Sequence, residues 1–187
     1  MQYRSSVSTC AEVPLVFCLG FAHAAGATVQ ASGDGDCAVT RPTESYYGND
    51  FLQEWLRPDG KFVFAPGGAG FVDRDGALGI KFAWNRLIEG DLYVGGRRLD
   101  GEAPPARAYM SSGYGDSGFQ PTYLVFPMAG CWEITGGVGD ARLKFVVYVE
   151  KVGDGPSWRF EGLGPGWRQT TGPENVSAET SVQMPSN

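Results

Sequence analysis

Ser117 lies in the run Gly115-Asp116-Ser117-Gly118, where flanking glycines could expose a serine hydroxyl as a nucleophile. Such a hydroxyl needs a neighbouring base that takes up its proton. The chain has one histidine, His23, in an apolar stretch near the N-terminus, and no serine is followed three positions later by a lysine. We therefore interpret residues 115–118 as a polar loop, and we name no catalytic residue.

Paired carboxylates can hydrolyse glycosides without a histidine, because one acts as an acid and the other as a nucleophile or base. The nearest candidates are Glu54 beside Trp55 and Glu133 beside Trp132. Sequence neighbours on a strand point to opposite faces, so we expect both glutamates to face solvent. The sequence singles out no pair, and a small carboxylate-dependent glycoside hydrolase stays the second alternative function.

Metal and cofactor sites are not indicated. Ligands for zinc, copper or haem are too few, and the Gly67-Gly68 and Gly136-Gly137 clusters precede no helix that could hold a phosphate. Asp73-Arg74-Asp75-Gly76 shares a fragment with a calcium loop but lacks the further oxygen ligands. We expect a turn there, no metal ligands and no cofactor.

Aromatic side chains supply the remaining candidate site. The 5 Trp and 8 Tyr could form a platform that stacks on sugar rings, or anchors for a protein partner. Alternation predicts that Trp84 and Trp132 are buried in the core. The candidate ligand surface consists of Tyr109, Tyr114, Trp158 and Trp167, with Tyr46 and Tyr47 as further surface groups.

Charge and composition narrow the class of protein. The 15 Lys and Arg against 21 Asp and Glu give a net charge of −6, which disfavours a nucleic-acid partner. The 28 Gly and 12 Pro oppose long helices, while 42% hydrophobic residues suffice for one core. A single domain is expected.

The N-terminal residues are typical of an export signal. Residues 13–27 carry no charged side chain and precede small residues, so we predict a signal peptide over 1–27 that is cleaved near Ala24 or Ala27. A poorly ordered extension is the alternative. The predicted mature protein is secreted or held in the cell envelope and has no transmembrane helix, and lipid anchoring stays open.

Two cysteines remain after removal of this leader, Cys37 and Cys131. In an oxidising compartment an even pair favours a disulfide bond, which we predict between them. Two buried, unpaired thiols are the alternative.

Short alternating runs separated by turn residues predict an all-β domain over residues 37–152, after a flexible spacer over 28–36. We expect a hairpin from 51–56 to 61–65, a bulged strand or tight hairpin over 87–94, and a terminal hairpin from 131–135 to 142–152. Residues 153–187 are expected to form a largely disordered C-terminal extension.

The run Gly130-Cys131-Trp132-Glu133-Ile134-Thr135-Gly136 resembles the penultimate strand of an immunoglobulin-like sandwich. More broadly, the chain is similar to a group of uncharacterised bacterial secreted or envelope proteins. The likeness covers about residues 37–152 and is carried by residues 37–42, 96–100, 113–120 and the Cys131-Trp132 strand. It implies an antiparallel, immunoglobulin-like β-sandwich and an exported location, and it assigns no activity.

These observations favour a non-catalytic, exported binding module. Its expected partner is an unknown protein or a polysaccharide of the cell envelope. A carbohydrate-binding domain that uses exposed aromatic residues is the first alternative.

Overall fold

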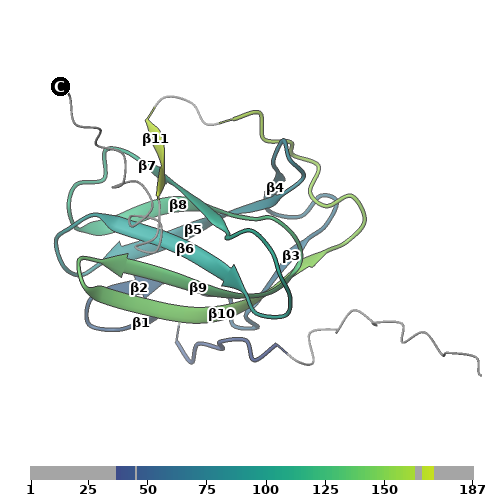
Figure 1. The fold of residues 1–187 in the computed structure, drawn as a ribbon. Coiled ribbons are helices and arrows are strands. Elements are labelled where there is room, and N and C mark those ends of the chain that lie inside the picture. Colours follow the sequence, from purple (N-terminus) through teal and green to yellow (C-terminus); the bar gives the residue numbers. More distant parts are fainter. Residues whose placement is uncertain (1–36, 45, 163–165, 171–187) are drawn as a thin grey trace, which may run out of the picture. The chain divides into compact units, whose positions relative to one another are not determined.

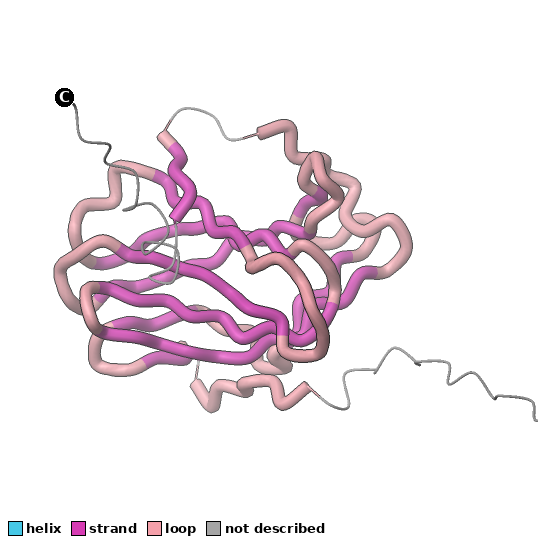
Figure 2. Tube along the Cα trace, viewed as in Figure 1, coloured by secondary structure: helices cyan, strands magenta, loops and turns pink. Residues whose placement is uncertain are grey.

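A computed structural model describes residues 37–44, 46–162 and 166–170. These residues form strands joined by turns and loops, with no helix among them (Figure 1, Figure 2). No helix able to span a membrane occurs within the described ranges. The prediction of an all-β fold is confirmed, whereas the predicted leader, the spacer and residues 171–187 of the extension lie outside the described residues.

The strands form two sheets. Sheet A follows the order β1-β2-β5-β8-β7-β11, with β4 paired to β5, and sheet B follows the order β3-β10-β9-β6. Sheet A comprises β1 (Tyr47–Gly48), β2 (Leu52–Glu54), β4 (Phe71–Val72), β5 (Leu78–Arg86), β7 (Arg107–Ser111), β8 (Gly118–Phe126) and β11 (Trp167–Thr170). Sheet B comprises β3 (Lys61–Phe64), β6 (Leu92–Arg98), β9 (Gly130–Val138) and β10 (Ala141–Lys151).

The two sheets pack face to face around one main core, which confirms a β-sandwich. Strand pairs within the sheets are antiparallel, apart from the parallel pair of β3 and β10. Alternation predicts one inward face on β5 with Leu78, Ile80, Phe82 and Trp84, of which Ile80 is half-buried against the core and the other three are buried. The inward-facing residues of β10 are buried as well: Leu143, Phe145, Val147 and Val149.

Trp84 makes a close contact between the sheets. A Cβ placed on Gly136 of β9 would lie 2.4 Å from Cζ3 of Trp84 and 3.0 Å from Cδ2 of Leu52. Only glycine at position 136 therefore lets the indole ring lie against the opposite backbone. The indole Nε1–H donates to the Thr122 hydroxyl at 3.2 Å, so this buried polar group has a partner.

The expected hairpin from 51–56 to 61–65 and the expected bulged strand or tight hairpin over 87–94 are both wrong, because the strands on either side of each turn belong to different sheets. The turn at residues 57–60 forms, with the Gly60 amide donating to the Arg57 carbonyl at 2.9 Å, but β2 before it lies in sheet A and β3 after it in sheet B. The 87–94 region likewise connects β5 of sheet A to β6 of sheet B. Turn residues act locally and do not determine which sheet the next strand joins. The terminal hairpin of β9 and β10 is confirmed.

Side chains from sheet A close both seams of the sandwich. At one seam, the Thr170 hydroxyl of β11 accepts from the Val94 amide at 3.2 Å and donates to the Val94 carbonyl at 3.0 Å. At the other seam, Tyr47 Oη and Asn49 Nδ2 donate to the carbonyls of Lys144 and Arg142 on β10. Backbone groups at the margins of sheet B thus bond to side chains where no strand adjoins.

Sheet A continues beyond residue 152, where we expected the domain to end. β11 pairs with β7, and the Trp167 ring stacks on Tyr123 with ring centroids 4.7 Å apart. Nearer the predicted boundary, the Phe160 amide donates to the Val72 carbonyl of β4 at 2.9 Å. Part of the extension therefore packs on the sandwich, because its aromatic residues bury apolar surface there.

The predicted disulfide bond is present. Cys37 and Cys131 are joined, with their Cα atoms 5.6 Å apart. Cys131 lies on β9, and the Thr40 amide near Cys37 donates to the Val146 carbonyl of β10 at 2.8 Å. The bond therefore attaches the first described residues to sheet B.

Removal of this bond should destabilise the fold. The two cysteines are 94 residues apart, so the bond closes a long loop in the unfolded chain. We expect Cys37→Ala with Cys131→Ala to lower the free energy of unfolding by about 2–4 kcal/mol. Urea denaturation with and without reductant measures this change. Reductant should have the same effect on the native protein and none on the double variant, and equal sensitivity of both would contradict the prediction.

Candidate functional site

Four aromatic rings form a continuous exposed row on the outer side of sheet A, which we call the aromatic strip. The ring centroids of Tyr46 and Trp55 are 4.5 Å apart, those of Trp55 and Phe119 6.4 Å, and those of Phe119 and Tyr114 5.8 Å. The four residues are 39% to 45% exposed. An apolar surface of connected rings is a typical mark of a binding site.

The alternation of β2 positions this strip. Leu52, Glu54 and Leu56 are at most 4% exposed, whereas Gln53 is half-buried and Trp55 is exposed on the opposite face. Phe119 reaches the same outer face from β8, because its partner Asn85 on β5 lies opposite Gln53 on β2. Phe119 therefore lies on β8 and Trp55 directly follows β2, while Tyr46 directly precedes β1 and Tyr114 lies in the loop before β8.

Two amide side chains lie beside the rings. Asn85 Nδ2 donates to Gln53 Oε1 at 3.4 Å, and both residues share a cross-strand row with Phe119. Each amide carries hydrogen-bond donors and acceptors in one plane. The surface therefore combines flat apolar rings with polar groups that can pair with hydroxyls.

The four residues predicted as a ligand surface fall into two groups. Tyr114 belongs to the aromatic strip. Tyr109, Trp158 and Trp167 instead belong to a second cluster on sheet A that also contains Phe71, Tyr123 and Phe160. In that cluster Trp158 is 51% exposed, while Tyr109 and Trp167 are half-buried.

Trp55 and Phe119 are strip residues that our sequence reasoning missed. The signal for Trp55 was present, because Leu52, Glu54 and Leu56 recur with period two and place residue 55 on the opposite face. Our assignment of Glu54 to the solvent-facing side exchanged the two faces of the strand and placed Trp55 on the wrong one. Phe119 gave no comparable signal, since it adjoins the polar 115–118 loop.

Glu54 corrects the expectation that both singled-out glutamates face solvent. It is 1% exposed; Oε1 accepts from the Ala83 amide at 3.2 Å, and Oε2 has no partner among the described residues. Burial raises the pKa of this carboxyl to about 8, and the bond from Ala83 offsets part of that rise. Glu54 is therefore a neutral core acid at neutral pH and is closed to substrate.

A pH dependence of stability follows from this burial. Between the usual pKa of 4.5 and about 8, the unfolded chain loses a proton that the folded protein keeps, so stability should fall as pH rises. The loss amounts to about 1.4 kcal/mol per pH unit at most. We expect Glu54→Gln to remove this slope and to be more stable than the native protein at pH 8, as measured by urea denaturation from pH 4 to 9.

The matched control for this measurement is Glu133→Gln. Hydrogen bonding to Arg97 and the nearby charges of Arg97 and Lys144 hold the pKa of Glu133 below its usual value, despite partial burial. Its contribution to stability is present at neutral pH and lost on acidification, so the slope of stability against pH has the opposite sign from that of Glu54. Equal slopes for Glu54→Gln and the native protein would contradict the assignment of a buried neutral acid.

The two glutamates do not form a catalytic pair. Glu54 points into the core from β2 of sheet A, whereas Glu133 lies on β9 of sheet B and is half-buried on its outer face. Glu133 lies 2.9 Å from Arg97 Nε and 3.6 Å from Lys144 Nζ. The carboxylates singled out from the sequence thus lie on opposite sheets.

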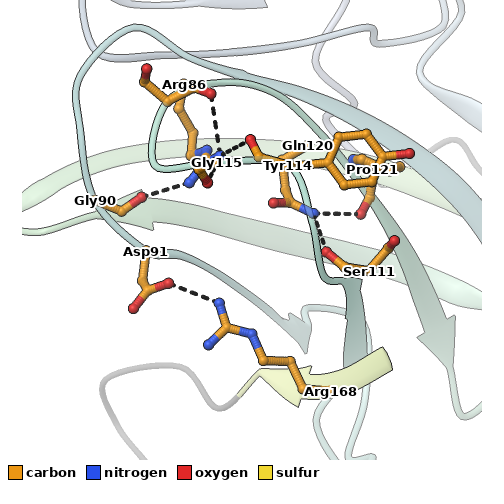
Figure 3. Close-up of polar contacts among 10 residues, drawn as sticks. Arg86, Gly90, Asp91, Ser111, Tyr114, Gly115, Gln120, Pro121 and Arg168 are labelled. Carbon is orange, nitrogen blue, oxygen red and sulfur yellow. Dashed lines mark hydrogen bonds and ion pairs between the residues drawn. The ribbon is translucent and has the colours of Figure 1, made fainter. Parts of the chain in front are cut away.

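The Arg86 side chain holds the loop that contains residues 115–118 by hydrogen bonds to its backbone carbonyls (Figure 3). This arginine is 3% exposed, and its Nη2 donates to the carbonyls of Tyr114, Gly115 and Ser117 at 3.2, 2.8 and 3.4 Å. Its Nη1 donates to the Gly90 carbonyl at 2.8 Å. The run is a loop, as we predicted, and the buried Arg86 guanidinium binds carbonyls within it and directly before it.

Replacement of Arg86 tests this role. In Arg86→Lys the charge remains, but an ammonium group cannot reach carbonyls on both sides as the planar guanidinium does. We expect a loss of about 2–4 kcal/mol in the free energy of unfolding and faster amide exchange in residues 112–118. Arg57→Lys is the control, since that side chain is 58% exposed and should change stability by less than about 0.5 kcal/mol. Unchanged exchange in the loop would contradict the assignment.

The carboxylates that suggested part of a calcium loop form a turn, as predicted. The Gly76 amide donates to the Asp73 carbonyl at 2.9 Å, and Asp73 and Asp75 bind Arg107 at 3.0 and 2.7 Å. Across the described ranges, no three side chains of histidine, cysteine, aspartate or glutamate are grouped to hold a metal ion.

Comparison of the chain with protein-family models and with curated proteins gives no match. The functional argument therefore depends on the two sheet surfaces alone.

Proposed function

We propose that this protein is a non-catalytic binding module whose aromatic strip binds a polysaccharide chain. The observation that carries the proposal is the row of four rings, each 39% to 45% exposed and each within 6.4 Å of the next. Aromatic rings have flat apolar faces on which the C–H faces of sugar rings can pack. A row of such faces suits an extended chain of sugars better than a single small molecule.

The amides beside the strip favour a sugar over an apolar protein surface. Gln53 and Asn85 offer planar donors and acceptors next to Phe119, and Tyr46 and Tyr114 add hydroxyl groups. None of the four rings and two amides carries a formal charge, which suits a neutral polysaccharide. Sugar hydroxyls need partners of this kind when they leave water.

We further propose that the sandwich is immunoglobulin-like and that the protein is secreted or held in the cell envelope. The two facing sheets and the β9–β10 hairpin support the first statement, although the parallel pairing of β3 with β10 departs from a purely antiparallel design. The Cys37–Cys131 bond supports the second, because disulfide bonds persist mainly in oxidising compartments. The resemblance to bacterial envelope proteins agrees with both.

Retention on insoluble polysaccharides tests the binding proposal. We expect the full chain to be retained on a neutral matrix such as cellulose or chitin, and Trp55→Ala to weaken binding about tenfold by removing one of the two inner rings. Trp158→Ala is the control, because Trp158 is 51% exposed but lies in the other aromatic cluster. Thermal unfolding should show that both variants remain folded.

Three outcomes would count against polysaccharide binding. They are no retention on any neutral matrix, equal losses in the two variants, and capture of a stoichiometric protein partner whose binding needs Trp55. The last outcome would instead identify the aromatic strip as a protein interface.

A further inference from the structure

A groove of about 360 Å³ lies at the seam where the edge strand β6 of sheet B meets β11 of sheet A. Its lining extends over the outer face of sheet B onto β9 and β10, and residues before and within β7 complete it. This volume is in the range of sites for small ligands. The groove belongs to a different sheet surface from the aromatic strip.

Missing side chains create the hollow. Gly95 on β6 lies opposite Thr135 on β9, which lies opposite Lys144 on β10, and a Cβ on Gly95 would contact nothing within 4 Å. In the neighbouring row the Tyr93 side chain crosses Gly137, where an added Cβ would lie 2.0 Å from Tyr93 Oη. The floor is therefore open at Gly95 and is bordered by an aromatic ring.

Cations outnumber acids in the lining. Arg97, Arg107, Arg142 and Lys144 line the groove, and Glu133 is the single acid of that lining. The Arg142 guanidinium lies 4.6 Å from the centre of the Tyr93 ring, which holds this cation beside the open floor. The chain as a whole carries a net charge of −6, so this concentration of positive charge runs against its general balance.

Each acid near these cations forms an ion pair with one or two of them. Glu133 binds both Arg97 and Lys144, so one carboxylate is shared by two cations. Asp73 and Asp75 bind Arg107. Arg142 has no acidic partner in the described structure and donates to the backbone carbonyls of Gly139 and Ala141. The surplus charge therefore lies on Arg97, Lys144 and Arg142.

Two buried polar atoms of lining residues have no partner. Among the described residues, the buried side-chain atoms without a hydrogen bond include Tyr93 Oη and Arg107 Nε, and both residues line the groove. Such groups are costly unless something pairs with them. Both atoms are themselves shielded from solvent, so the indication of a negatively charged occupant comes from the surplus positive charge of the open groove.

We propose that this groove is a second ligand site, which binds the carboxylate, sulfate or phosphate group of a sugar-sized molecule. Arg97, Arg142 and Lys144 supply charge-assisted hydrogen bonds to the oxyanion. The Tyr93 ring offers an apolar face to the carbon skeleton, and the Thr135 hydroxyl lies in the row of the open floor. The site acts independently of the aromatic strip.

Titration of the full chain with small sugars tests the proposal. The probes are glucuronate, glucose 6-phosphate, glucose 6-sulfate and uncharged glucose, each followed by amide chemical shifts and by calorimetry at low salt. We expect at least one charged sugar to bind about tenfold or more tightly than glucose, with shifts centred on Gly95 and Thr135, and binding to weaken as salt is added. The relative affinities identify which oxyanion the site prefers.

Variants separate this site from general charge effects. Gly95→Val places a branched side chain in the open space on a strand that tolerates it, and should abolish binding. Arg142→Gln should weaken binding about tenfold, whereas Glu133→Gln, which frees two cations, should strengthen it. Lys151→Gln is the control; it removes the same charge as Arg142→Gln at the far end of β10 and should leave affinity unchanged.

Several results would overturn the proposal. They are no binding of any charged sugar, glucose binding as tightly as the charged sugars, and retention of full affinity in Gly95→Val and Arg142→Gln. Because none of these variants changes the aromatic strip, retention on a neutral polysaccharide should be unaffected. The proposal for the groove and the proposal for the aromatic strip can therefore be contradicted independently.

Discussion

The indole ring of Trp84 lies against the bare backbone of Gly136, and this contact sets how closely the two sheets approach. Leu52 packs at the same place from the neighbouring strand, so the inward phase of β2 follows from it. With Leu52 inward, period-two alternation places Glu54 in the core and Trp55 on the outer surface. The inward position of Leu52 thus leads both to a buried acid with a raised pKa and to an exposed tryptophan. The aromatic strip therefore depends on the core beneath it.

The outer faces of the two sheets differ in chemistry because different residues occupy the outward positions. On sheet A these positions carry rings and amides such as Trp55, Phe119 and Asn85, which suit uncharged partners. On the part of sheet B that lines the groove they carry a glycine at position 95 and charged residues such as Arg97 and Lys144, so Gly95 leaves a hollow that Lys144 borders. The same sandwich therefore offers one apolar and one electropositive surface, and neither needs a catalytic residue.

Much of the interior could be predicted from local patterns, since alternation in β5 and β10 identified the buried faces and the cysteine count identified the disulfide bond. The pairing of strands could not, because the turns at residues 57–60 and 87–91 connect different sheets and nothing local distinguishes such a crossing from a hairpin. Of the four residues predicted as a ligand surface, Tyr114 lies in the aromatic strip and the other three lie in the second aromatic cluster. The strip and the groove depend on residues that only cross-strand register brings together, namely Trp55 with Phe119 and Gly95 with Lys144.

The hydroxyl and amide groups that close the seams have a consequence for self-association. A bare margin of a sheet is a template on which a second chain can add a strand, and repeated addition leads to fibrils. On β10 the carbonyls of Arg142 and Lys144 are occupied by Asn49 and Tyr47, and on β6 Thr170 occupies both polar groups of Val94. An incoming strand would have to displace these side chains first, so the protein can expose aromatic rings for a ligand while these parts of the margins of sheet B resist templated polymerisation.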